Sequence, residues 1–193
     1  MGPVTGGTCQ RHTYGYERPL VERLKRGFHK NAETIPNSDA DWVRLRAEPQ
    51  TEFMREVRKL AQKHKPHLPI AALVGHPWHY RGEQNKIDGN LRGLLLNVTT
   101  WAREGLVDSV VAAGYYRDGG NAELAWQALH KETEGKLGVW TYAWVPSSVT
   151  DVESTFALAD KVGASQILFW ESDYIDDRKN AAELKAAMRK RVG

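Results

Sequence analysis

Four short apolar runs recur along the chain from residue 68 onward. They read LPIAALVGHP (68–77), LVDSVVAAGYY (106–116), LGVWTYAWVP (137–146) and SQILFWESDYI (165–175). Each run is nearly continuous in apolar residues, which is typical of parallel strands buried on both faces. Their starts are separated by 28 to 38 residues, which is about the length of a βαβ unit. We therefore predict four parallel strands.

A segment with helical spacing of apolar residues follows each run. The predicted helices cover residues 90–105, 121–136, 150–163 and 180–192. In the third of them, Thr150 and Glu153 have the spacing of a capping box, and Gly163 is a typical helix end. The fourth starts at Asn180 and carries Arg and Lys in its last turn, where the helix dipole favours cations.

The first third of the chain is different, because no strong strand pattern precedes residue 68. Residues 18–30 read as a helix with Pro19 near its start. Residues 36–65 read as one long helix or a pair of helices, entered through a Ser38-x-x-Asp41 capping pattern, and Pro49 is expected to kink or break it. We therefore expect a single domain over 1–193, with a helical lead-in over 1–67 and four βα units over 68–193.

Alternating strands and helices with short connections predict an α/β fold with right-handed crossovers. Four strands, each followed by a helix, form either a small open sheet or part of a (β/α)8 barrel. A complete barrel needs about 250 residues, more than the 193 present. No glycine-rich phosphate loop follows any of the runs, which argues against a nucleotide-binding domain.

Charge and composition exclude several classes of partner. The net charge is only +3, and basic residues alternate with acidic ones, so we expect no nucleic acid partner. Cys9 is the single cysteine, which excludes an intramolecular disulfide and a cysteine-based metal site. The chain has no apolar run of about 18 residues and no signal-peptide pattern at its start, so we expect no membrane partner, and the compartment stays open.

Several segments resemble one known group of enzymes. YGYERPLVERLKRGF, DADWVRLRAEPQTEFMREVRK and the run ends GHPWHY, GYY, TYAW and FWESDYID are similar to the C-terminal half of family-10-like glycosyl hydrolase domains. The similarity extends from about Tyr14 to Gly193 and is most specific over Asp41–Arg58. This resemblance implies a partial (β/α)8 TIM barrel in which the four strands are barrel strands five to eight.

The same resemblance implies that strands one to four are absent, as in a truncated gene or a split barrel. A split barrel would close by pairing with itself as a homodimer or with a complementary half-barrel.

Barrel active sites lie at the C-terminal ends of the strands. Those ends carry aromatic residues, histidines, an arginine and carboxylates, a mixture that suits a carbohydrate. The predicted substrate-binding residues are His76, Trp78, His79, Tyr115, Tyr116, Arg117, Tyr142, Trp144, Trp170 and Asp173. The alternative is that Trp140, Trp144 and Trp170 simply pack between strands and helices.

Glycoside hydrolysis usually needs two carboxyl groups. If the fourth strand alternates regularly, Ile167, Phe169, Glu171 and Asp173 share one face. The other face then carries Leu168, Trp170 and Ser172. Glu171 would then be the first polar residue above an apolar barrel interior, where burial raises a carboxyl pKa, so it is the candidate catalytic acid. Asp173 is expected at the rim, whereas Asp176 and Asp177 are expected to lead into the last helix.

One feature disagrees with the enzyme group that the resemblance implies. There the acid and the nucleophile end strands four and seven, but strand four is absent and the corresponding seventh strand, GVWTYAWVP, has no carboxylate. Either other carboxylates act, or this chain alone is inactive. His76-x-x-His79 has no further ligand nearby in the sequence, so we expect no metal and no cofactor.

The sequence thus leads to a glycoside hydrolase-like TIM-barrel protein that acts on or binds a polysaccharide or oligosaccharide. A non-catalytic carbohydrate-binding or assembly half-barrel is the alternative, and a small open-sheet domain of unrelated function is the third possibility.

Overall fold

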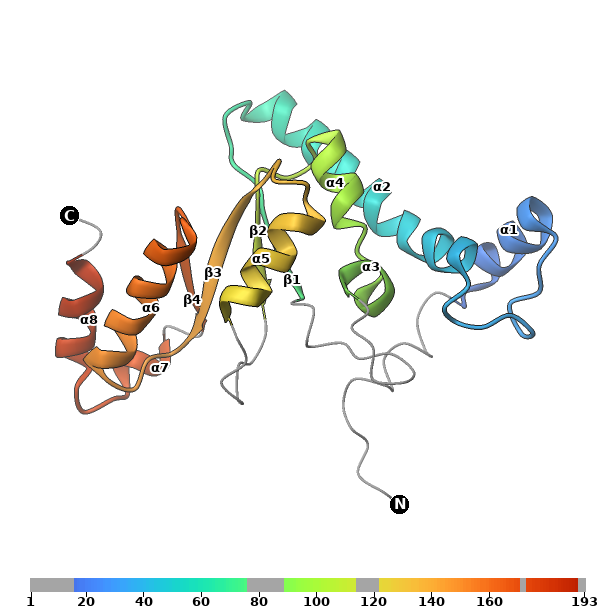
Figure 1. Ribbon diagram of the computed structural model, residues 1–193. Helices are drawn as coiled ribbons and strands as arrows, with labels where there is room; N and C mark the ends of the chain where they lie inside the picture. Colours follow the sequence, from blue (N-terminus) through green and yellow to red (C-terminus); the bar gives the residue numbers. More distant parts are fainter. Residues whose placement is uncertain (1–15, 76–88, 114–121, 171–172, 191–193) are drawn as a thin grey trace, which may run out of the picture.

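The computed structural model describes residues 16–75, 89–113, 122–170 and 173–190 (Figure 1). Its centre is a four-stranded sheet whose strand order follows the chain, and all three strand pairs are parallel. The strands are β1 (Ala71–Gly75), β2 (Ser109–Ala113), β3 (Gly138–Trp144) and β4 (Ile167–Trp170). Each lies inside one of the four apolar runs, which confirms the predicted strands and the α/β class.

Two helices precede the sheet, and at least one helix follows each strand. They are α1 (Arg18–Phe28), α2 (Ala40–His64), α3 (Gly89–Leu94), α4 (Val98–Glu104), α5 (Ala122–Glu132), α6 (Val149–Val162), α7 (Asp173–Asp176) and α8 (Ala181–Arg189). None of the described helices is both long and apolar enough to cross a membrane.

The strand order places α4, α5 and α6 on one face of the sheet. Right-handed crossovers that always advance to the next strand put every connecting helix on the same side. The core between the two layers agrees, because Val74, Val110 and Val139 of the first three strands pack with Val98 of α4 and Leu129 of α5. We call this side the helix-covered face.

The segment between β1 and β2 departs from the predicted single helix over residues 90–105. It contains two helices, α3 and α4, with Leu95 in the left-handed region at φ +61° between them. The side chain of Asn97 accepts a hydrogen bond from the backbone N–H of Thr100 at 3.2 Å and so caps α4. A side chain that caps a new helix start competes with continuation of the preceding helix.

Both predicted capping patterns are displaced. The box of α6 is formed by Ser148 and Asp151 instead of Thr150 and Glu153, because Ser148 has the extended backbone that an N-cap needs. At the start of α2, the Asp39 carboxylate, and not Ser38, accepts hydrogen bonds from the backbone of the first turn. The predicted end of α6 at Gly163 is confirmed, with φ +71°.

Helix α2 continues through Pro49, so the structure confirms the alternative of one long helix and the break that would have given a pair does not occur. Pro49 is exposed, and tertiary contacts hold the helix beyond it. Trp101 of α4 donates its indole N–H to the Thr51 hydroxyl at 3.2 Å. Arg58 donates to the carbonyl of Leu106 at 3.1 Å and to the Asp108 carboxylate at 2.9 Å. These contacts compensate for the hydrogen bond that a proline removes.

Candidate functional site

The structure describes four of the residues that the sequence nominates for the site: Tyr142, Trp144, Trp170 and Asp173. The other nominated residues lie outside the described residues and stay predictions: His76, Trp78, His79, Tyr115, Tyr116, Arg117 and Glu171.

The pairing of β3 with β4 brings three of the four together. The register places Tyr142 opposite Leu168 and Trp144 opposite Trp170, at the C-terminal end of both strands. The rings of Tyr142 and Trp170 lie 6.3 Å apart, centroid to centroid, with a tilt of 38°. We call Tyr142, Trp144 and Trp170 the aromatic platform.

The aromatic platform lies on the face of the sheet opposite the helix-covered face. Val139 packs in the core below α5, and side chains alternate along a strand, so Tyr142 and Trp144 point to the other side. Trp144 is 44% exposed and Trp170 is 37% exposed, whereas Tyr142 is 9% exposed. Trp144 and Trp170 are therefore not fully buried between strands and helices.

The face assigned to Phe169 is reversed in the structure. Phe169 lies edge-on against Phe156 of α6, at a centroid distance of 6.3 Å and an angle of 74°, on the helix-covered face. The expectation that Phe169 lies on the face toward a barrel interior, below Glu171, is therefore wrong. Alternation along β4 from Phe169 therefore no longer places Glu171 above a barrel interior.

Asp173 is the first residue of α7 and is exposed. A carboxylate in the first turn of a helix interacts favourably with the helix dipole. Asp176 ends α7 and forms an ion pair with Lys185 of α8, so it belongs to the approach to the last helix, as expected.

Sequence reasoning omitted Trp140 from the site set. Trp140 precedes Tyr142 by two residues and is half-buried, so it lies on the same face of β3 as the aromatic platform. The signal was present in the alternation of aromatic residues through WTYAW (140–144).

A carboxylate with a raised pKa lies elsewhere. Burial raises the pKa of Glu132, and a hydrogen bond from the Asn90 side chain at 2.7 Å opposes part of that rise. Glu132 ends α5, so it lies near the N-terminal ends of the parallel strands, away from the aromatic platform. Across the described ranges, no group of three or more metal-ligating side chains is placed to hold a metal ion.

Comparison with known proteins finds no family model that matches the chain and no significant match to a curated protein. The geometry of the aromatic platform therefore carries the functional argument.

Proposed function

We propose that the chain binds an oligosaccharide or polysaccharide on the aromatic platform, as part of a glycoside hydrolase-like (β/α)8 barrel. The observation that supports the proposal is the pairing of Trp144 with Trp170 at the C-terminal ends of two parallel strands, with more than a third of each residue exposed.

Sugar rings carry apolar C–H faces that stack on aromatic rings, while their hydroxyl groups need polar partners. Trp and Tyr supply both, because each combines a large apolar ring with one hydrogen-bonding group. Ligand sites of barrels also lie at this end of the strands, among the loops that follow them. An exposed pair of indole rings there suits a chain of sugar units.

Hydrolysis would require a carboxyl pair flanking the bound sugar. Glu171 remains the proposed acid on its position alone, because it directly follows the C-terminal end of β4, where barrel active sites lie, and its partner carboxylate is not yet assigned. Asp173 is the proposed polar residue at the rim, two residues further along the chain.

Binding can be measured by titration calorimetry with hexasaccharides of glucose, xylose and mannose. Trp144→Ala and Trp170→Ala should each weaken binding at least tenfold, equal to about 1.4 kcal/mol, because each removes a stacking surface. Phe53→Ala is the matched control, since Phe53 is an exposed aromatic residue (66%) on α2. If wild type and Trp170→Ala bound the sugars with equal affinity, the aromatic platform would not be the sugar-binding site.

A reducing-sugar assay, run beside these titrations, separates an enzyme from a binding module. Glu171→Gln should abolish release of reducing sugar while leaving the affinity within about threefold, because a general acid acts in the chemical step. Sugar binding without turnover by the wild-type chain would instead favour the second candidate, a non-catalytic carbohydrate-binding or assembly half-barrel. The exposed Leu73 (44%) on edge strand β1 favours the assembly role.

A further inference from the structure

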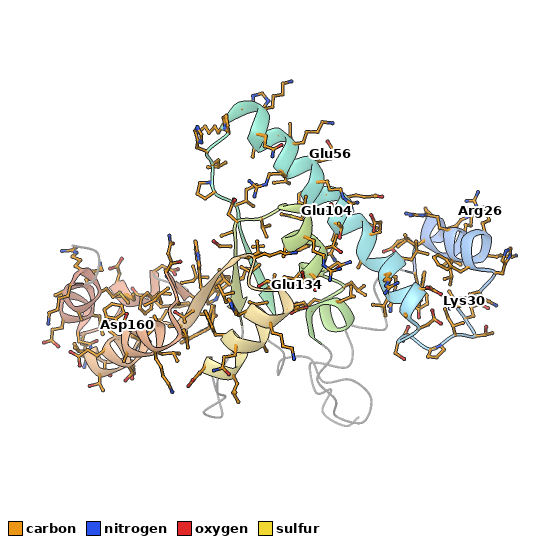
Figure 2. All side chains as sticks on the ribbon, turned by 45° about the horizontal axis from the view of Figure 1, so that its top comes forward. Arg26, Lys30, Glu56, Glu104, Glu134 and Asp160 are labelled. Atoms are coloured by element: carbon orange, nitrogen blue, oxygen red, sulfur yellow. The ribbon has the colours of Figure 1, made fainter. Side chains whose placement is uncertain are left out.

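A pocket between α1 and α2 lies apart from the aromatic platform. Arg26 marks its place on α1, at the opposite end of the molecule from Asp160 of α6 (Figure 2). Its volume is about 650 Å³, within the range of pockets that hold small molecules. The pocket is lined by Arg23, Arg26, Gly27 and Phe28 from α1 and by Arg44, Leu45 and Glu48 from α2.

Three guanidinium groups face a single carboxylate in this pocket. The carboxylate of Glu48 already accepts a hydrogen bond from Arg55 at 2.7 Å. Arg26 has only long contacts with Glu22, 3.5 Å to its carboxylate and 3.4 Å to its carbonyl. Within the described residues, Arg23 and Arg44 form no ion pair. The pocket therefore has an excess of positive charge.

The helix dipoles explain the position of only one of these three arginines. Arg26 lies in the last turn of α1, where the helix dipole favours a cation. Arg44 is near the N-terminal end of α2, where the same dipole favours anions. Arg23 is in the middle of α1. Local helix stability thus explains neither Arg23 nor Arg44.

Gly27 provides an independent observation. Its backbone is not in the left-handed region, so the chain conformation does not require a glycine there. A side chain added at Gly27 would meet no other atom within 4 Å, so packing does not require a glycine either. Glycine is unfavourable in a helix. What Gly27 does is leave the space open, one turn beyond Arg23 on the same side of α1.

We propose that this pocket binds a small organic oxyanion, a phosphate ester or carboxylate attached to a ring. Guanidinium groups bind such oxyanions through paired hydrogen bonds. Phe28 is 43% exposed and offers an aromatic surface for the ring of the ligand. This site is separate from the aromatic platform and does not depend on the carbohydrate proposal.

Calorimetry at low salt tests the proposal with three probes: phenyl phosphate, benzoate and inorganic phosphate. Phenyl phosphate or benzoate should bind at least tenfold more tightly than inorganic phosphate, because only they can use Phe28. Which of the two binds better identifies the oxyanion. No binding of either ring-bearing probe at about 10 mM, roughly the weakest useful affinity, would overturn the proposal.

Variants localise the binding. Arg23→Ala and Arg44→Ala should each weaken it at least tenfold, and Gly27→Leu should abolish it by filling the pocket while the thermal midpoint stays at or above that of wild type. Lys25→Ala is the matched control, because it removes one positive charge from α1 but does not line the pocket. An equal loss in Lys25→Ala, or unchanged binding in Gly27→Leu, would show that the ligand does not occupy this pocket.

Discussion

Glu132 links three helices through partly buried polar contacts. Its carboxylate accepts a hydrogen bond from the side chain of Asn90, which is 1% exposed, at 2.7 Å. Its backbone carbonyl accepts a hydrogen bond from the Thr99 hydroxyl at 2.9 Å. Residues of α3, α4 and α5 are joined in this way at the N-terminal end of the sheet. These contacts therefore hold the three helices together at that end.

Replacing Glu132 by Gln should make stability less dependent on pH. Burial raises the pKa of Glu132 in the folded state above its ordinary value of 4.5. The folded protein then binds more protons than the unfolded chain, so stability falls as pH rises from 4.5 through the folded pKa. Glutamine cannot ionise and still accepts from Asn90.

Urea unfolding checks this expectation. Glu132→Gln should be within about 1 kcal/mol of wild type near pH 4 and more stable than wild type near pH 7. Glu153→Gln, at an exposed glutamate of α6, should track wild type at both pH values. A variant that is less stable than wild type near pH 7 would mean that the charged carboxylate is stabilising.

At the scale of single elements, the start of α6 shows how a helix N-terminus is chosen. The Asp151 carboxylate accepts hydrogen bonds from the backbone N–H of Ser147 at 2.8 Å and of Ser148 at 3.0 Å. In return, the Ser148 hydroxyl accepts from the N–H of Asp151 at 3.1 Å. The pKa of Asp151 is lowered below its ordinary value of 3.8, mainly by the hydrogen bond from the Ser147 hydroxyl and further by those from the backbone of Ser147 and Ser148.

Asp151→Ala should therefore destabilise the protein by about 1 kcal/mol near pH 7, the typical cost of losing a helix cap. The difference should disappear below pH 3.8, because a depressed carboxylate pKa gives stability that is lost as the carboxylate becomes protonated. Urea unfolding of this variant is compared with Glu153→Ala, which should change stability by less than about 0.5 kcal/mol. If Glu153→Ala lost more stability than Asp151→Ala, the capping box predicted from the sequence, Thr150 with Glu153, would be the one that stabilises α6.

At the scale of the whole molecule, the unpaired edge of β1 is a surface on which another chain could pair. β1 pairs only with β2 in the described sheet, so one side of it is unpaired. Leu73 of β1 and Phe53 of α2 line an apolar pocket of about 400 Å³ beside this edge. Leu73 is 44% exposed and Phe53 is 66% exposed. Unpaired edges next to exposed apolar residues promote pairing with other chains. A second copy of this chain is the partner that we propose.

Leu73→Lys should reduce that self-association, because a lysine at a strand edge opposes pairing. Light scattering across a range of protein concentrations should show wild type above the monomer mass and the variant close to it. Leu124→Lys on α5 is the matched control, since Leu124 is 43% exposed and lies away from the edge. A wild-type chain that stays monomeric throughout would contradict the proposed pairing.

Some elements could be predicted from the sequence and others could not. The four strands were predictable because continuous apolar runs at βαβ spacing are a local signal. The split between α3 and α4 was not, because it depends on Leu95 adopting a left-handed backbone, which no spacing of apolar residues reports. For α2 the sequence left one long helix or a pair open, because the contacts of Thr51 and Arg58 with distant residues, which hold the helix beyond Pro49, give no local signal.

The sequence by itself determined the α/β class, the parallel strands and the end of α6 at Gly163, because these depend on residue type and near-neighbour spacing. Only the tertiary structure decided that Trp144 faces Trp170 and that Phe169 packs on α6. In a strand that is apolar at every position, alternation does not say which face meets the helices. The pocket that contains Arg23, Arg26 and Arg44 likewise lies between α1 and α2. No local sequence pattern shows how close two helices come to each other.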